Sequence, residues 1–371
     1  MNYAQNGYNS AFSHIYVEER ILSHPRTQKI LAHFPNAQVI SIGHYKDVFC
    51  RRGQQYVQQH QAQNLILAKK EDHFIYEGAK PCQDFGNEHF YYCSTMMNCM
   101  FDCSYCYLKG MYPSGHMVIF VNLEDYFEKL EEMLAKSEIY LCVSYDADLL
   151  AMDSLTGYAS AWADFAKKHG NLKIEIRTKS ARMEMWEQCE PASNVIYAFT
   201  VAPEEIIAAS EKKTPSAKAR IACAAEGVKR GFAVRLCFDP MLYLPNWKEY
   251  YGNLLEAFDQ AFVEKGCRFS DVMDVSVGAF RISQDYMKKI RRVEPDSVIV
   301  QFPFVNEGGI YQYPRSLLER MNSIWWKSWK SVFRVIVFFW TGSEKDNATE
   351  KECNCNGSKF RHWIFHCKRI V

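Results

Sequence analysis

The residues with the clearest chemical meaning in this sequence are three cysteines, Cys99, Cys103 and Cys106, spaced as CxxxCxxC. They follow His-Phe-Tyr-Tyr-Cys (89–93), an aromatic-rich run that predicts a β-strand. Three thiolates on one loop can each bind one iron of a 4Fe–4S cluster, which leaves the fourth iron without a protein ligand. The amino and carboxylate groups of S-adenosylmethionine (SAM) can fill that open position. An electron from the reduced cluster then cleaves SAM to a 5′-deoxyadenosyl radical.

A zinc loop is the alternative interpretation of these cysteines. A structural zinc site needs four ligands, usually on paired Cys/Cys or Cys/His arms. Cys93 could be the fourth ligand, but no matching second pair lies near it. The spacing, the preceding strand and Tyr105 between the last two cysteines instead resemble the radical SAM superfamily. Six other cysteines are expected to be small buried apolar residues: Cys50, Cys82, Cys189, Cys223, Cys237 and Cys267.

Composition limits the possible partners and compartment. The 371 residues carry 44 basic and 43 acidic side chains, so a nucleic acid would have to meet a local basic patch rather than a global positive field. The 14 cysteines, in a chain whose start lacks the layout of a signal peptide, are expected to be reduced, which predicts a cytoplasmic protein. The apolar run 332–340 contains Arg334 and is too short to cross a bilayer, so no membrane contact is expected.

Strand-like and helix-like segments alternate after the cysteine loop. This alternation predicts parallel strands with helices outside them, in a barrel or an open doubly wound sheet. A single helix is expected over 154–170 and a shorter one around 181–188. Two further strand-like runs, 297–304 and 310–313, flank Asn306-Glu307-Gly308-Gly309 and predict a β-hairpin. The expected strands are 139–146, 172–179, 194–202, 232–240 and 271–280.

From about Ile40 to Arg320 the sequence resembles the spore photoproduct lyase family, DNA repair enzymes of endospore-forming bacteria. The resemblance is strongest over 85–127, where Cys-Ser-Tyr-Cys-Tyr-Leu is followed by the segment Val-Asn-Leu-Glu-Asp. It implies an α/β fold, a partial (β/α)6 TIM-type barrel with an N-terminal extension and a C-terminal β-hairpin. It also implies a reaction that reverts 5-thyminyl-5,6-dihydrothymine to two thymines with a 4Fe–4S cluster and SAM, which is regenerated.

The resemblance divides the chain into four regions. An N-terminal α/β region (1–87) packs on the radical SAM partial barrel (88–280), and a hairpin region for DNA and lesion binding (281–323) follows. The last region (324–371) is an atypical tail, since MNSIWWKSWK (321–330) replaces the family's amphipathic helix. The implied partners are double-stranded DNA containing spore photoproduct and an electron donor such as a ferredoxin or flavodoxin. A monomer in the spore core is expected.

The residue that returns a hydrogen atom to the product is where this sequence departs from the family. The usual donor is a cysteine in Ser-Cys-Thr-Ser-Asp, upstream of Asp-x-Leu-Thr. Here the match with Asp153-Ser154-Leu155-Thr156 places Tyr145 at that position. Cys142, three residues earlier, would face the opposite side of a regular strand, so Cys93 is the favoured donor. Both thiols could equally be inert core residues.

The resemblance also implies other site residues. Tyr105 and Tyr107 match family tyrosines of the radical relay, although aromatic residues beside a cluster could serve packing alone. The expected SAM contacts follow successive strands: Ala147, Asp148, Lys179 and Thr200. Lys179 could pair with the SAM carboxylate or be a solvated lysine. The expected DNA contacts, which could also be a solvated helix face, are Arg281, Lys288, Lys289, Arg291, Arg292 and Arg315.

Two other functions remain compatible with the sequence. A radical SAM enzyme for a different substrate would show the same three cysteines. A structural metal-binding module would show them without any chemistry.

Overall fold

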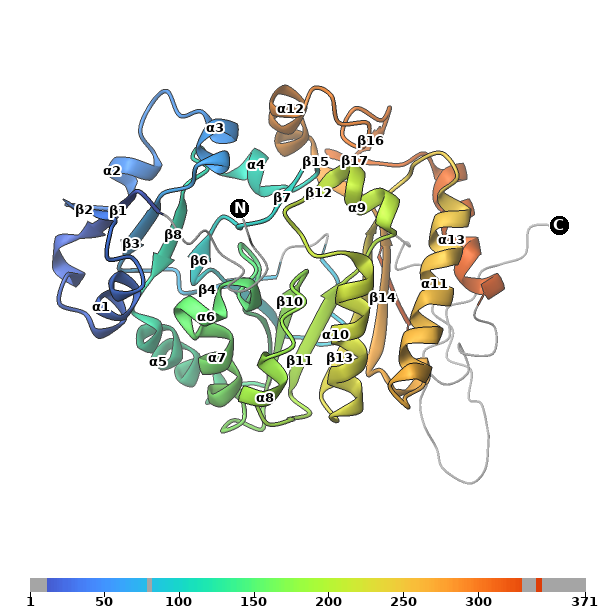
Figure 1. Cartoon of the computed structure of the whole chain (residues 1–371), viewed down its shortest axis with the longest axis horizontal. Coiled ribbons are helices and arrows are strands. Elements are labelled where there is room, and N and C mark those ends of the chain that lie inside the picture. The colour runs from blue at the N-terminus through green and yellow to red at the C-terminus, as the bar shows by residue number, and fades with distance from the viewer. Residues whose placement is uncertain (1–11, 79–81, 329–337, 342–371) are drawn as a thin grey trace.

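The computed structural model describes residues 12–78, 82–328 and 338–341 (Figure 1). Its larger sheet has the strand order β18-β14-β13-β11-β10-β9-β5-β4. Six neighbouring strands, β5 to β14, run parallel, as expected for a partial (β/α)6 barrel. They are β5 (Phe90–Cys93), β9 (Ile139–Cys142), β10 (Leu172–Thr178), β11 (Val195–Thr200), β13 (Ala233–Met241) and β14 (Asp274–Ala279).

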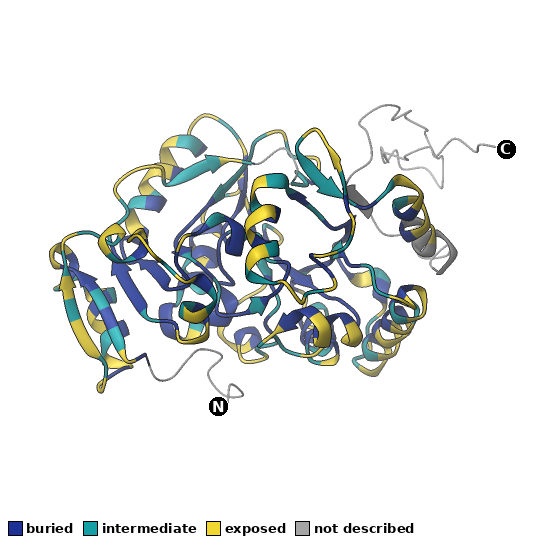
Figure 2. Ribbon diagram, turned by 90° about the horizontal axis from the view of Figure 1, so that it is seen from above, coloured by how far each residue is buried: buried dark blue, intermediate teal, exposed yellow. Residues whose placement is uncertain are grey.

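Helices cover the outside of these strands, which explains why β9, β10, β11, β13 and β14 are buried along most of their length. In Figure 2 the strands are dark blue, and the helices expose one face. Helix α11 shows the pattern clearly, because Leu254, Leu255, Phe258 and Phe262 are buried on one face. The covering helices are α5 (Leu123–Leu134), α7 (Tyr158–Ala166), α8 (Met185–Gln188), α9 (Glu204–Ser210), α10 (Ala217–Lys229) and α11 (Trp247–Glu264).

The helix expected over 154–170 is interrupted. Helix α6 (Asp153–Thr156) ends at Gly157, whose φ of 66° is left-handed, and α7 begins at the next residue. The Asp153 carboxylate stabilises the new start, since it accepts a hydrogen bond from the Ala159 amide at 2.7 Å. The helical periodicity was therefore right, but the break depends on one glycine.

A buried ionic network forms one end of the barrel interior. Arg235 on β13 forms ion pairs with Asp274 on β14 and Glu175 on β10. Tyr140 donates a hydrogen bond to Glu175 at 2.6 Å, and the Arg235 guanidinium lies 3.3 Å from the Phe85 ring centroid. Because each charge has a partner, the network can be buried among apolar strands.

The second sheet does not coincide with the expected N-terminal region. Its order is β2-β1-β3-β8-β6, with β6 antiparallel to β8. Strands β6 and β8 come from 88–280, because the chain first adds β4 (Ile75–Glu77) and β5 to the larger sheet and then returns to the second sheet. A boundary at residue 87 is therefore not a boundary between sheets. The elements are β1 (His14–Glu18), α1 (Pro25–Ala32), β2 (Gln38–Ile42), α2 (Lys46–Phe49), α3 (Tyr56–Gln61), β3 (Leu65–Ala68), β6 (Met96–Met97) and β8 (Met117–Phe120).

The expected hairpin exists but begins later than predicted. Strands β16 (Val305–Glu307) and β17 (Ile310–Gln312) pair, and β15 (Arg281–Ser283) adds a third strand. The run 297–304 is not a strand, because the carbonyls of Val300 and Phe302 accept hydrogen bonds from Arg291 instead of from a neighbouring strand. Ile299, Val300 and Phe304 are buried in this loop, which Arg291 of α12 (Gln284–Val293) holds by its hydrogen bonds, whereas Val298 is exposed.

The end of the described chain crosses the expected boundary at residue 323. Helix α13 (Arg315–Ser328) continues past it, and β18 (Phe338–Thr341) pairs in parallel with β14. The rest of the region 324–371 lies outside the described residues. No helix within the described ranges is long and apolar enough to cross a membrane.

Candidate active site

The cysteine loop lies between the two sheets and is tied to both. Its strand β7 (Asp102–Cys103) forms a separate two-stranded sheet with β12 (Glu211–Lys212), which directly follows α9 of the barrel layer, with Cys103 opposite Glu211. On the other side, the Gln63 side chain donates to the Cys99 carbonyl at 3.2 Å. The loop therefore has a fixed backbone at the carboxyl ends of the parallel strands, where barrel enzymes place their chemistry.

The environment of the three thiols fits a metal cluster. Burial raises the pKa of Cys99 to about 12 and raises the pKa of Cys103 and of Cys106. Backbone amides oppose this effect, because the Phe101 amide donates to the Cys99 sulfur at 3.4 Å. In the part of the chain that the structure describes, no three metal-binding side chains are drawn together as around an ion. Their convergence on iron, with loss of the thiol protons, remains a prediction.

Lys179 lies beside these thiols at the end of β10. Its ammonium is 3.9 Å from the Glu211 carboxylate and 5.7 Å from the Tyr105 ring centroid. Burial opposes its charge, but Glu211 and Cys103 outweigh burial and raise the Lys179 pKa. The Tyr105 hydroxyl also donates to Glu211, and Arg220 pairs with that carboxylate at 2.7 Å. Lys179 is therefore a charged, oriented cation beside the cysteine loop.

The other expected SAM residues also lie at strand ends. Ala147 and Asp148 follow β9, and Thr200 ends β11. The Asp148 carboxylate accepts hydrogen bonds from the Thr178 hydroxyl at 2.8 Å, the Lys179 amide at 2.7 Å and the Ala151 amide at 3.0 Å. Its side chain therefore positions the backbone that carries Lys179.

Tyr145 lies outside the β-strand that the sequence argument expected to carry it. Strand β9 ends at Cys142, so the alternation of strand faces does not extend to Tyr145. The Tyr145 ring stacks on Tyr92, with ring centroids 4.1 Å apart. Its hydroxyl lies 3.5 Å from the Cys82 sulfur and shares a hydrogen bond with it. Burial and Cys82 raise the Tyr145 pKa, so the phenol keeps its hydrogen.

Sequence reasoning assigned Cys82 to the apolar core. Only the fold brings residues 82 and 145 together, since they are 63 positions apart and share no motif. The favoured donor, Cys93, is fully buried in β5, where it pairs with Ile75 in the sheet. Cys142 is also buried, and its sulfur lies 4.0 Å from Glu175 of the ionic network. Neither of these two thiols has a hydrogen bond to a tyrosine among the described contacts.

Asp146 is a second residue that sequence reasoning missed. It is buried, and it accepts hydrogen bonds from Ser94, from Tyr112 and from the Tyr107 hydroxyl at 3.2 Å. Tyr107 also donates to the Tyr145 carbonyl at 2.6 Å. Asp146 and Tyr107 thereby fix the backbone on which Tyr145 sits. No sequence motif signals this role.

The expected DNA contacts divide into exposed and internal groups. On α12, Lys288, Lys289 and Arg292 are exposed. Arg291 is turned inward, where it donates to the Val300 carbonyl at 2.9 Å and lies 5.3 Å from the Tyr311 ring centroid. This geometry argues against a phosphate contact for Arg291.

Of the two expected DNA-contacting arginines outside α12, one is held inside by an ion pair and the other is exposed. Arg281 is held by Asp239 at 3.2 Å, whereas the Arg315 side chain is 85% exposed beside Glu319.

Helix α12 is locked onto the cysteine loop through α4 (Leu108–Met111). The Lys109 ammonium, 3% exposed, pairs with Asp102 of the loop at 2.6 Å and with Glu294 at the end of α12. Gly110 packs so tightly that a Cβ there would lie 2.6 Å from the Tyr286 Cα. Any larger residue at position 110 would push α12 away from the loop.

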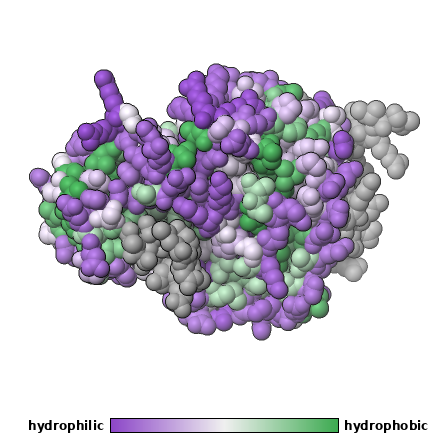
Figure 3. All heavy atoms as spheres, turned by 45° about the horizontal axis from the view of Figure 1, so that its top comes forward, coloured by the Kyte–Doolittle hydropathy of each residue, from purple (hydrophilic) through white to green (hydrophobic). Residues whose placement is uncertain are grey.

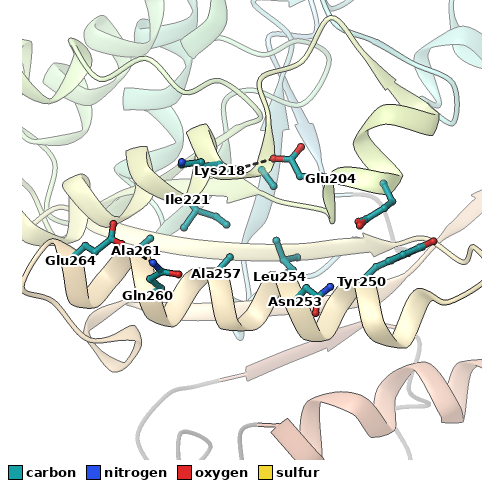
Figure 4. Close-up of a pocket in the computed structure, with 12 residues that line it drawn as sticks. Glu204, Lys218, Ile221, Tyr250, Asn253, Leu254, Ala257, Gln260, Ala261 and Glu264 are labelled. Carbon is teal, nitrogen blue, oxygen red and sulfur yellow. Dashed lines mark hydrogen bonds between the residues drawn. The ribbon is translucent and has the colours of Figure 1, made fainter.

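A groove of roughly 370 Å³ lies elsewhere, on the helical layer between α10 and α11 (Figure 4). Glu204, Lys218, Tyr250 and Asn253 line it, and none of the expected site residues does. The candidate site is therefore the cysteine loop and the strand ends around it.

Comparisons with known proteins identify the family of this chain. A family model described as spore photoproduct lyase matches residues 11–294. A relative from Clostridium acetobutylicum, named spore photoproduct lyase, is 21% identical over 294 residues, which are 77% of this chain and 83% of the relative.

Solved structures show the same fold. A cysteine-to-alanine variant of spore photoproduct lyase with dinucleoside spore photoproduct has a TM-score of 0.76 and 16% identity, over 89% of this chain and 99% of that one. A second variant, with bound AdoMet and the same dinucleoside, has a TM-score of 0.74 and 16% identity, over 89% and 98%. The expected fold and family are confirmed: the chain belongs to the spore photoproduct lyase family of radical SAM lyases.

Proposed function

We propose that this chain repairs spore photoproduct in double-stranded DNA, with a 4Fe–4S cluster held by Cys99, Cys103 and Cys106. The observation that carries the proposal is the fixed cysteine loop at the strand ends, with the Lys179 cation on one side and the Tyr145–Cys82 pair on the other. The cluster with bound SAM supplies a 5′-deoxyadenosyl radical that removes the hydrogen on C6 of the lesion. In this arrangement Lys179 binds the SAM carboxylate.

The hydrogen atom for the product comes from Tyr145 in this proposal. Cleavage of the bond between the bases leaves an allylic thymine radical. Its new C–H bond forms as the Tyr145 O–H bond breaks, and the Cys82 S–H, 3.5 Å away, then restores the phenol. One hydrogen atom moves at each step: the resulting Cys82 thiyl radical would take back a hydrogen atom from 5′-deoxyadenosine, and the deoxyadenosyl radical so formed would recombine with methionine to regenerate SAM. Tyr145 thus passes a hydrogen atom from the Cys82 thiol to the thymine radical.

DNA binding is assigned to α12 and the adjacent hairpin. Lys288, Lys289, Arg292 and Arg315 are exposed and suited to phosphate contacts, and Arg281 lies at the start of β15. The hairpin could hold the duplex open while the lesion is extruded. The chain acts as a monomer in the spore core and receives electrons from a ferredoxin or flavodoxin.

The test is an anaerobic assay with reconstituted protein, SAM, dithionite and a duplex carrying one spore photoproduct. We expect a visible band near 400 nm, and chromatography should show conversion of the lesion to two thymines. Cleavage of SAM with an intact lesion would instead point to another substrate. A colourless protein would point to a structural metal site.

A further inference from the structure

Four basic residues surround α3, and we call them the α3 basic patch: Arg51, Arg52, Lys212 and Lys213. Arg51 and Arg52 lie in the turn before α3, which Gly53 completes with a φ of 76°. Lys213 donates to the His60 carbonyl of α3 at 3.3 Å, which places the second pair beside the same helix. Arg51, Arg52 and Lys212 are exposed, and among the described residues none of these three forms an ion pair, so their charge is available to a partner. Lys213 is partly buried and acts electrostatically on Asp102 of the cysteine loop.

The patch lies directly over the backbone that carries the cysteines. Lys212 is on β12, opposite Asp102 in the pairing with β7, and Glu211 is opposite Cys103. From α3, the Tyr56 hydroxyl donates at 3.1 Å to Asn98, the residue before Cys99. One strand and one helix therefore separate this surface from the cysteine loop.

The patch uses different elements from the proposed DNA surface. Helix α12 packs on α4, whereas α3 and β12 pack on the residues before and within the cysteine loop. Figure 1 shows α4 between α3 and α12 at the end of the molecule where the strands finish. Figure 3 turns this end forward, and its upper edge is mostly hydrophilic.

We infer that the α3 basic patch is the docking surface for the electron donor, a small acidic protein that carries a flavin or an iron–sulfur group. The inference rests on the proposed function. One electron leaves the partner's reduced group, which is oxidised by one electron, and enters the cluster, with no bond made or broken in this chain. Opposite charge steers and orients such transient partners. The position over the cysteine loop favours an electron carrier over a second DNA contact.

The test uses the reconstituted full chain with Arg51→Glu and Arg52→Glu together. The probe is a recombinant bacterial flavodoxin, oxidised for binding and reduced by its NADPH-dependent reductase for turnover. Lys136→Glu with Lys168→Glu is the matched control, because both lysines are exposed at the ends of α5 and α7. A second variant, Lys212→Gln with Lys213→Gln, tests the barrel side of the patch.

We expect flavodoxin to bind the patch variants about tenfold more weakly at low salt. Flavodoxin-driven repair should fall while dithionite-driven repair and duplex affinity stay unchanged. The inference is overturned if flavodoxin binding and flavodoxin-driven repair are unchanged in both variants, or if only duplex affinity falls, which would make the patch a DNA contact. If the unaltered chain shows no dithionite-driven repair, the proposed function is refuted instead.

Discussion

Tyr145 stands at the sequence position where the family usually has its donor cysteine. In the structure, the thiol of another residue lies against the Tyr145 hydroxyl. A phenol alone is a poor terminal donor, since its radical must itself be quenched. Cys82, half-buried with its sulfur 3.5 Å from the Tyr145 hydroxyl, would supply that second hydrogen in the proposed mechanism, whereas Cys93 and Cys142 lie within strands. At this scale the chemistry depends on one contact between residues from distant parts of the sequence.

Cys82→Ala should keep the cluster and SAM cleavage but lose clean repair. The first thymine radical can still take the Tyr145 hydrogen, but the phenol is not restored, so in later turnovers the thymine radical persists and dithionite-derived adducts should accumulate in the chromatogram. Cys93→Ala, the control, should repair normally, although the cavity costs stability of roughly 1–2 kcal/mol. Normal repair by Cys82→Ala with adducts from Cys93→Ala would restore the sequence-based choice.

Cys103→Ala should abolish cluster binding, because a water molecule is a poor substitute for a thiolate at iron. Iron and sulfide analysis, with the visible spectrum, measures this. Cys223→Ala is the matched control, since this buried cysteine donates to the Arg182 carbonyl far from the loop in sequence. Full iron content in the Cys103 variant would exclude this residue as a ligand.

Helix α12 differs between its exposed and its buried face. Its exposed face carries Lys289 and Arg292, and its buried face carries Arg291, whose guanidinium holds the loop that leads to the hairpin. A run of basic residues in the sequence cannot distinguish these roles. The distinction depends on which side of the helix meets the carbonyls of 300 and 302.

Lys289→Ala with Arg292→Ala should weaken duplex binding and reduce its salt dependence. Each phosphate contact contributes about 0.9 to the slope of log affinity against log salt. Arg291→Met should leave the slope unchanged and instead lower the melting temperature, because two buried carbonyls lose their donor. A titration of affinity against salt, with thermal unfolding of each variant, separates the two. An unchanged slope in the double variant would exclude this face of α12.

The sequence predicted the elements better than their pairing. The five strand-like runs after the cysteine loop each contain a barrel strand, because apolar runs of this length report burial on both faces. The same signal failed at 297–304, where Ile299 and Val300 are buried in a loop. The cysteine motif located the loop, yet Glu211, Asp146 and Cys82 carry no local signal. They act through partners that only the fold brings near.

At the scale of the molecule, the two sheets are interleaved rather than joined by a linker. The chain leaves the second sheet after β3, forms β4 and β5 of the larger sheet, and returns to the second sheet through β6 and β8. Neither sheet is complete without a segment from the other side of the cysteine loop. The described structure therefore cannot be divided at residue 87 without removing pairing partners.

We expect the two sheets to unfold in one transition. Circular dichroism and tryptophan fluorescence should give coincident denaturant curves, because no contiguous half of the chain holds a complete sheet. A fragment lacking residues 1–87 should be insoluble or unfolded, since it exposes the edge of β8 that pairs with β3. Two separated transitions would contradict this expectation.

The two buried ion pairs of Lys109, which we call the Lys109 bridge, couple the position of α12 to the position of the cysteine loop. A single ammonium joins Asp102 of the cysteine loop to Glu294 at the end of α12, so a ligand that shifts α12 must also shift the loop. Linked equilibria are reciprocal. If the duplex binds α12 as proposed, a duplex that stabilises this arrangement should favour SAM binding by the same factor by which SAM favours the duplex. We therefore expect the Lys109 bridge to act as an interlock that couples occupation of the DNA surface to occupation of the SAM site.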